Sequence, residues 1–277
     1  MRVELHCHSI HSDGSLPAGE VARQAQRTGV ELFCLTDHDT CGGFDETVAV
    51  IGAGPCQVLR GLELSCRANG RTVHVLLYGL QPGDGLAALQ QRLDAIHVER
   101  RDRLRRICGR LAGMGIHVDA DRLLSRTHGR TPGRPDVARA LIEQGVVSTP
   151  QEAFARFLRD GGPADVPLQR LSVADGVALG LAAGARASLA HPHTFGDFAQ
   201  VRALVAAHRD GGLTGLEAYY GSYARAESEG WLRLCHEFDL VPTGGSDFHG
   251  DMNPAVTQPG ITLPPGAGER ITRWLGL

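Results

Sequence analysis

Histidine and aspartate side chains crowd the start of this 277-residue sequence. His6 and His8 end an apolar run at residues 3–8, and Asp13 follows in a turn. If residues 3–8 form a β-strand, the imidazoles of His6 and His8 project from the same face. A single histidine on an apolar strand is more often a hydrogen-bonded core residue. The pair followed by a carboxylate instead indicates a metal site.

The same arrangement recurs at or near the ends of later apolar runs, at His38, Glu63, His191, Asp247 and His249, and His74 lies inside another run. A buried carboxylate without a counter-charge is costly, and several that converge repel one another. Divalent cations remove both costs. Imidazole and carboxylate ligands without thiolate favour Mn, Fe or Zn in a catalytic site over a closed structural zinc site.

Seven short apolar segments must position these residues, at 3–8, 31–39, 57–64, 72–79, 187–193, 214–220 and 240–249. Such nearly continuous apolar runs are typical of parallel strands covered on both faces. Helical patterns lie between several of them, at residues 17–28, 172–183, 198–209 and 224–238. Because strand and helix alternate, the sequence predicts an α/β fold. In a parallel barrel the carboxyl ends of the strands meet at one mouth.

Residues 85–162 break this alternation. They contain a long helical pattern at 86–114, a Gly/Pro-rich stretch at 126–136 and a further helical pattern at 137–160. We interpret this segment as a helical insertion. The expected organisation is a first barrel part at 1–84, the insertion at 85–162 and a second barrel part at 163–277.

Composition excludes several classes of protein. The net charge of −3 provides no general attraction to nucleic acid or to an anionic membrane. Seven scattered cysteines without a CxxC pair argue against a secreted disulfide framework. We find no signal-peptide pattern and no apolar run long enough to span a membrane. The sequence therefore predicts a soluble cytoplasmic protein, and it indicates no membrane or protein partner.

The chemistry-bearing motifs also resemble, in the same order, those of the polymerase and histidinol phosphatase (PHP) superfamily. They are HCHSIHSDG, TDHD, the isolated Glu63, His74, AHP and GSDFH. The strongest likeness is to PHP phosphoesterases of the nucleoside bisphosphate phosphatase and exonuclease type, and it covers essentially the whole chain. It implies a distorted (β/α)7 barrel with a helical insertion. The barrel mouth would hold two or three divalent metal ions.

By this resemblance the metal ligands are His6, His8, Asp13, His38, Glu63, His74, His191, Asp247 and His249. Glu63 would bridge two ions. The catalytic role would fall to Glu63, His191 and Asp247 through a metal-bound hydroxide, and the resemblance identifies no general acid. Asp37 would orient a ligand imidazole.

Metal ions in such a cluster suit the hydrolysis of phosphate esters. A water between two cations loses a proton more easily, and the cations screen the charge of the phosphate. We expect a small phosphomonoester substrate, such as a nucleotide or nucleoside bisphosphate. Three alternatives stay open: a 5′–3′ exonuclease on short oligonucleotides, an amidohydrolase-like enzyme, and a non-catalytic metal-binding module.

Two arginines of the insertion are candidates for binding the substrate phosphate, because the guanidinium group can bind it through two parallel hydrogen bonds. Arg100 occupies a gap in the apolar stripe of the long helix, and Arg134 lies in a GRPD segment that resembles the family pattern. The chain departs from that pattern at Asp136, Asp165 and Thr194, where relatives often carry histidine, tyrosine and a basic residue. These departures leave the nucleotide specificity open.

Overall fold

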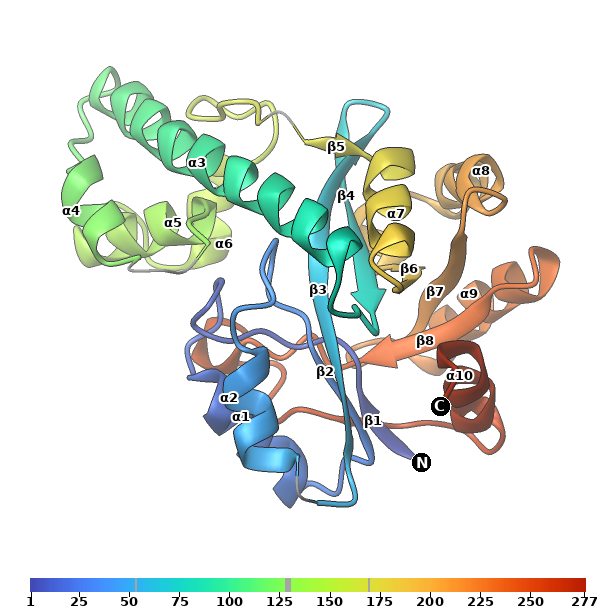
Figure 1. Ribbon diagram of the computed structural model, residues 1–277. Helices are drawn as coiled ribbons and strands as arrows, with labels where there is room; N and C mark the ends of the chain where they lie inside the picture. Colours follow the sequence, from blue (N-terminus) through green and yellow to red (C-terminus); the bar gives the residue numbers. More distant parts are fainter. Residues whose placement is uncertain (53, 128–130, 169) are drawn as a thin grey trace. The chain divides into compact units, whose positions relative to one another are not determined.

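A computed structural model describes residues 1–52, 54–127, 131–168 and 170–277 (Figure 1). The chain forms two compact units. The first contains residues 1–91 and 171–277, and the second contains residues 92–170. Part of the Gly/Pro-rich stretch, residues 128–130, lies outside the described residues. The domain boundaries expected from the sequence stay a prediction.

In the first unit, nine strands of the described chain form one sheet in the order β8-β7-β6-β4-β3-β2-β1-β9, with β5 paired to β3. The strands are β1 (Arg2–Glu4), β2 (Leu32–Leu35), β3 (Gln57–Ala68), β4 (Arg71–Tyr78), β5 (Leu171–Ser172), β6 (Arg186–Leu189), β7 (Leu213–Tyr220), β8 (Val241–Gly245) and β9 (Ile261–Thr262). The segments that follow β1 and β8 also pair with each other, through a parallel bridge between Cys7 and Phe248. The sheet is therefore a nearly closed barrel, and the predicted fold is confirmed.

The strand β4 differs from the expected parallel arrangement, because it runs antiparallel to both β3 and β6. Only Asn69 and Gly70 connect β3 to β4, and both have positive φ values, of 49° and 78°. A two-residue Asn-Gly turn joins antiparallel strands, whereas a parallel pair needs a crossover of a dozen or more residues. Glu63 consequently lies in the middle of a long strand, and His74 lies near the beginning of the next.

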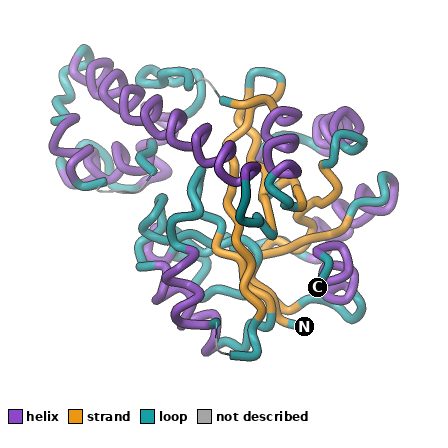
Figure 2. Tube along the Cα trace, in the orientation of Figure 1, coloured by secondary structure: helices purple, strands orange, loops and turns teal. Residues whose placement is uncertain are grey.

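Helices of the first unit follow or flank these strands, as Figure 2 shows. They are α1 (Ala18–Arg27), α2 (Phe44–Ile51), α7 (Val173–Ala182), α8 (Phe198–His208), α9 (Arg225–Glu237) and α10 (Ala267–Leu275). The four helices predicted at 17–28, 172–183, 198–209 and 224–238 are confirmed within two residues at each end. Among the described residues, no helix is both long and apolar enough to cross a membrane.

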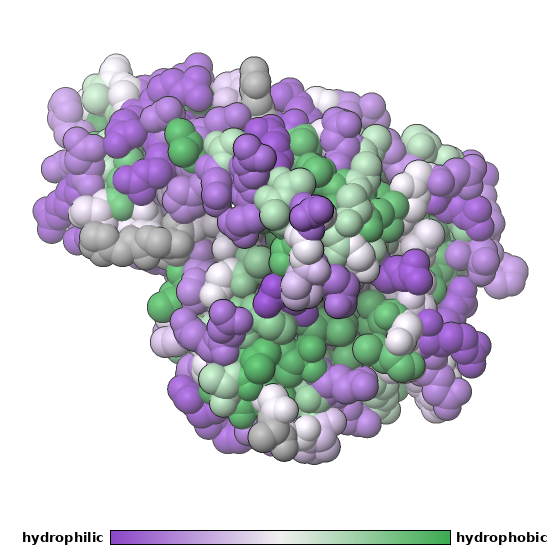
Figure 3. Space-filling view, viewed as in Figure 1, coloured by the Kyte–Doolittle hydropathy of each residue, from purple (hydrophilic) through white to green (hydrophobic). Residues whose placement is uncertain are grey.

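The second unit is helical. It contains most of α3 (Asp84–Ala112), together with α4 (Ala120–Ser125), α5 (Arg134–Glu143), α6 (Pro150–Ala153) and a π-helical turn at Phe154–Leu158. Its core packs apolar side chains such as Leu104 and Leu141. The helical pattern at 137–160 is interrupted after α5 at Gly145, whose φ is 70°. Hydrophilic residues cover most of the surface that Figure 3 shows.

Candidate metal centre

The chain after β1 presents His6 and His8 on the inner side of the barrel. Both side chains are buried, and their ring centroids lie 5.3 Å apart. Cys7 lies between them and belongs instead to an apolar cluster that also contains Phe33. This alternation is what an extended segment dictates, because successive side chains point to opposite faces.

Asp37 holds the loop that follows. Its carboxylate accepts hydrogen bonds from the Ser9 amide and hydroxyl at 2.8 and 2.7 Å, and from the Ser12 hydroxyl at 2.6 Å. The Ser12 hydroxyl also lies 3.3 Å from Nδ1 of His8. The Asp37 carboxylate therefore reaches the His8 imidazole through the Ser12 hydroxyl.

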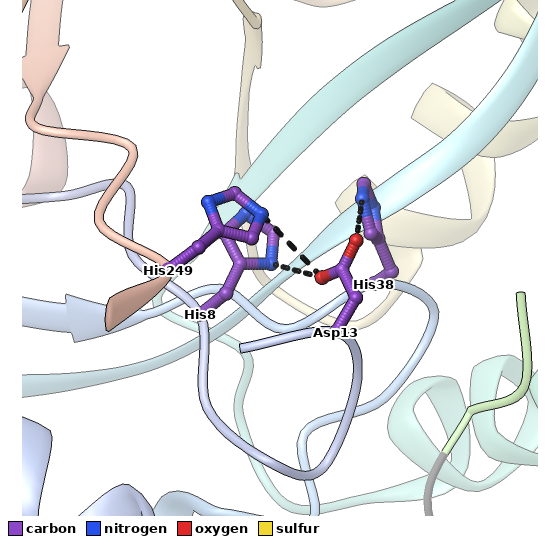
Figure 4. Close-up of side chains that lie close together, drawn as sticks. All are labelled: His8, Asp13, His38 and His249. Atoms are coloured by element: carbon purple, nitrogen blue, oxygen red, sulfur yellow. Dashed lines mark ion pairs between the residues drawn. The ribbon is translucent and has the colours of Figure 1, made fainter. Parts of the chain in front are cut away.

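Three imidazoles surround Asp13 at the end of this loop, as Figure 4 shows. The Asp13 carboxylate oxygens lie 3.5 Å from His8 Nδ1, 3.6 Å from His38 Nε2 and 3.4 Å from His249 Nε2. The His8 and His249 rings are stacked, with centroids 4.0 Å apart. Residues separated by more than 200 positions in the sequence thus meet at one carboxylate.

Glu63 lies at the centre of the cluster and is fully buried. Five histidine nitrogens lie between 2.9 and 3.5 Å from its carboxylate oxygens, and they belong to His6, His8, His38, His74 and His191. Its position inside the barrel follows from the length of β3, which carries this residue past the end of β2. Because histidines contact both of its oxygens, the Glu63 carboxylate has the arrangement that a ligand bridging two metal ions requires.

Asp247 contacts the same nitrogens of His6 and His8 that Glu63 contacts. Its Oδ1 is 3.3 Å from His6 Nε2 and 3.4 Å from His8 Nε2, and its Oδ2 accepts a hydrogen bond from the Tyr220 hydroxyl at 2.6 Å. Asp247 and His191 have positive φ values of 54° and 22°. Such backbone conformations are costly for residues other than glycine and are common at functional sites.

The charges of the site act strongly on one another. Burial lowers the pKa of His6, but the negative charges of Glu217, Asp247 and Glu63 outweigh burial and raise this pKa well above its usual range. Burial also lowers the pKa of His8, but its close contacts with the Asp247 and Glu63 carboxylates raise this pKa to about 10. Burial raises the pKa of Glu63, yet the surrounding histidines hold it well below its ordinary value. The metal-free site therefore favours protonated His6 and His8 beside ionised Glu63, whereas burial lowers the pKa of His74 to about 4 and keeps this imidazole neutral.

Among the proposed ligands, which all lie in the described part of the chain, four buried polar atoms make no hydrogen bond: His6 Nε2, His8 Nε2, His38 Nδ1 and Glu63 Oε2. Buried polar atoms are normally satisfied. The ligand atoms form four groups within 4.8 Å: His8, Asp13, His38 and His249; His6, His8 and Asp247; His6, Glu63 and His191; His38, Glu63 and His74. Each of the four residues with an unsatisfied atom belongs to two groups. Nitrogen and oxygen donors in this arrangement fit bound divalent cations.

Glu217 is a buried carboxylate that the sequence analysis missed. It lies on β7, where its carboxylate contacts His6 Nδ1 at 2.9 Å and accepts a hydrogen bond from the His191 amide at 2.6 Å. The only signal for it is a glutamate within the apolar run at 214–220. By occupying Nδ1 of His6, Glu217 directs Nε2 of the same ring towards Glu63 and Asp247.

The two candidate phosphate ligands lie in the second unit. Arg134 is the first residue of α5, and its guanidinium donates to the Leu158 carbonyl and to Asp160, both at 2.7 Å. Arg100 is buried on α3. Burial and the positive charges of Arg134, Arg170 and Arg100 together lower the pKa of the nearby Arg103 to about 9. The second unit thus concentrates positive charge around Arg103.

Comparisons with known proteins agree with these features. A model of the PHP domain matches residues 4–106. The chain is 30% identical over 258 residues to a 3′,5′-nucleoside bisphosphate phosphatase of Chromobacterium violaceum, covering 89% of this chain and 87% of the relative. It is 30% identical to a 5′-3′ exoribonuclease of Haemophilus influenzae, covering 90% of each protein. It is 31% identical to a phosphoribosyl 1,2-cyclic phosphate 1,2-diphosphodiesterase of Eggerthella lenta, covering 94% of this chain and 98% of the relative.

Solved structures give the same result. A protein of Chromobacterium violaceum described as an amidohydrolase, with bound sulfate and no metal, superposes with a TM-score of 0.86 at 28% identity, covering 97% of this chain and 96% of that one. A protein of Bifidobacterium adolescentis described as a metal-dependent phosphoesterase gives a TM-score of 0.83 at 26% identity, covering 98% and 95%. The chain belongs to the PHP family and is a metal-dependent phosphoesterase.

Proposed function

We propose that this phosphoesterase hydrolyses a small phosphomonoester, a nucleotide or nucleoside bisphosphate, at a centre of two or three divalent ions. The observation that carries the proposal is the convergence of imidazoles and carboxylates around Glu63, where four buried polar atoms have no hydrogen bond to any described residue. The proposed ligands are the nine residues that the sequence predicts. Their division among individual ions, and the choice among Mn, Fe and Zn, belong to the proposal.

Bound divalent ions would supply an activated water as nucleophile and would neutralise the charge of the phosphate. The residues of the chain hold and orient these ions. Oε1 of Glu63 contacts His6, His74 and His191, and its Oε2 contacts His8 and His38. Asp247 contacts His6 and His8. Glu217 fixes the His6 ring, so that this ligand is ordered before the substrate arrives.

Arg134 and Arg100 are the proposed ligands of the substrate phosphate. Mutual repulsion around Arg103 favours the binding of an anion among these arginines. Arg134 also has a structural role, because it donates to Leu158 and Asp160 within its own unit. An arginine with both roles must exchange or share these hydrogen bonds when phosphate binds.

The substrate class rests on the relatives. One is named for a nucleoside bisphosphate, one for exoribonuclease activity and one for a cyclic phosphoribosyl substrate. We rank the bisphosphate first, and a 5′–3′ exonuclease on short oligonucleotides second. An amidohydrolase-like activity ranks lower, because it leaves the arginines of the second unit without a role.

The experiment that tests the proposal is a phosphate-release screen with purified protein supplied with Mn²⁺. It compares nucleoside 3′,5′-bisphosphates, nucleoside monophosphates, sugar phosphates and short oligonucleotides. We expect the fastest release from a nucleoside bisphosphate. Cleavage of oligonucleotides without release from bisphosphates would reverse the ranking, and no hydrolysis of any phosphate ester would overturn the proposal.

A further inference from the structure

Three aromatic rings gather where β6 and β7 end. His193 lies in the short 3-10 helix Pro192–Thr194 after β6, Tyr220 ends β7, and Tyr223 lies in the turn that follows. Ring centroids lie 5.3 Å apart for His193 and Tyr220, 5.2 Å for His193 and Tyr223, and 5.0 Å for the two tyrosines. Because β6 and β7 are neighbouring parallel strands, their carboxyl ends bring the rings together. We call these three residues the aromatic cluster.

The aromatic cluster adjoins the candidate metal centre. The Tyr220 hydroxyl donates a hydrogen bond to Asp247 Oδ2 at 2.6 Å. The ring centroids of Tyr220 and His193 lie 6.2 and 6.3 Å from that of His191. A substrate whose phosphate is bound beside His191 and Asp247 therefore has its organic part within reach of these rings.

The cluster is ordered by hydrogen bonds but is not part of the core. His193 is exposed, and Tyr220 and Tyr223 are half-buried, whereas the core tyrosine Tyr78 is only 1% exposed. The Tyr223 hydroxyl is hydrogen-bonded to His193 Nδ1 at 2.7 Å. This bond and the bond from Tyr220 to Asp247 fix the directions of the rings. Ordered rings that keep accessible surface are suited to bind an aromatic group without a large loss of side-chain entropy.

We propose that the aromatic cluster binds the base of a nucleoside-containing substrate by stacking. Every nucleobase has a π-face, so this contact tolerates different bases. A sugar phosphate without a base lacks the aromatic surface that the cluster would cover. The inference rests on the proposed function and narrows it, because it places the base beside His193 and Tyr223 and favours nucleosides over simple sugars.

The test compares two substrates that differ only in the base. They are adenosine 3′,5′-bisphosphate and a methyl ribofuranoside 3,5-bisphosphate, which keeps both phosphates and replaces the base with a methoxy group. The measured quantity is the ratio of their kcat/KM values. We expect His193→Ala and Tyr223→Leu each to lower this ratio by about tenfold. Tyr223→Phe keeps the ring and should retain most of the ratio.

Phe198→Leu is the matched control. Phe198 is an exposed aromatic residue at the start of α8, but its ring stacks on Trp231 and lies outside the aromatic cluster. Its substitution should leave the ratio unchanged. Circular dichroism and thermal melting establish that each variant is folded before its kinetics are compared.

Two outcomes separate this inference from the proposed function. If both bisphosphates are hydrolysed and the ratio is the same in His193→Ala, Tyr223→Leu and the parent, base stacking is overturned and the phosphatase proposal stands. If the parent releases phosphate from no phosphate ester, the proposed function fails. Calorimetric titration with adenosine then tests base binding. Weaker binding of adenosine to His193→Ala and Tyr223→Leu than to the parent supports the inference. Equal binding to all three proteins, or no binding to the parent, overturns it.

Discussion

Nδ1 of His6 lies 2.9 Å from Oε1 of Glu217, and both side chains are fully buried. The two residues are 211 positions apart in the sequence. The same carboxylate accepts a hydrogen bond from the backbone amide of His191, whose φ is 22°. The Glu217 carboxylate thus orients the ring of one proposed metal ligand, His6, and stabilises the strained backbone of another, His191.

Replacing Glu217 with glutamine should weaken metal binding while the barrel still folds. The amide keeps the shape of the side chain but removes the charge that supports the His6 ring. Loss of such a supporting carboxylate costs roughly 10–100-fold in metal affinity or activity. Calorimetric titration with Mn²⁺ measures the affinity, and phosphate release measures the activity.

The matched control for this change is Glu227→Gln, at an exposed glutamate in the first turn of α9. It should bind Mn²⁺ as the parent does. Parental affinity in Glu217→Gln would show that His6 is positioned without this carboxylate.

Glu63→Gln should abolish most activity, because Glu63 is the only proposed ligand that contacts five of the proposed ligand histidines. An amide offers one oxygen in place of two and carries no charge, so it cannot bridge two cations. We expect activity to fall by more than about 100-fold and the bound metal to fall with it. Elemental analysis and initial rates check both. Glu20→Gln is the control, at a partly exposed glutamate of α1 outside the centre. Full activity in Glu63→Gln would contradict the proposed ligand set.

The sequence was sufficient to place His6, His8 and Cys7, because the alternation of an extended segment is a local property. It was also sufficient for the helices, whose apolar periodicity is local too. The direction of β4 was missed, although the Asn69-Gly70 pair is a strong hairpin signal. The continuous apolar runs of both segments favour parallel strands and so conflict with the hairpin signal.

Glu217 could not be assigned a role from the sequence, because its role depends on which strands become neighbours when the barrel closes. A glutamate in an apolar strand can face solvent at an edge, pair with an arginine or support a ligand. Only the pairing of β6, β7 and β8 and the approach of the chain after β1 place it beside His6. Long-range neighbours of this kind are not encoded in local periodicity.

Metal binding should release protons at neutral pH. The pKa values of His6 and His8 are raised, that of His8 to about 10, so both imidazoles carry a proton in the metal-free protein at pH 7. A ligand nitrogen must lose its proton before it binds a cation. Apparent affinity should therefore rise with pH. Titration with Mn²⁺ in two buffers of different ionisation enthalpy measures the protons released, and equal heats in both buffers would falsify this prediction.

The stability of the metal-free protein should fall as the pH rises, whereas its affinity for metal should rise. His8 has a folded-state pKa of about 10 against an ordinary value of 6.5. A raised pKa means that the folded state binds the proton more tightly, so the stabilisation is complete below pH 6.5 and is lost as the pH rises through 10. Thermal melting of the protein in a metal chelator should show a falling Tm over this range. A Tm that rises from pH 7 to pH 10 contradicts the ion pairs of the metal-free site.

Arg134→Ala should raise the KM for the phosphate substrate by roughly 10–100-fold, because loss of a charge-assisted bidentate contact weakens phosphate binding. The same substitution removes the hydrogen bonds to Leu158 and Asp160, so Tm should fall as well. Arg105→Ala is the control, since Arg105 is an exposed residue of α3 that pairs with Asp102. A purely structural Arg134 would lower Tm and leave the KM of the folded variant unchanged. A raised KM at a temperature well below Tm therefore distinguishes phosphate binding from a role in folding alone.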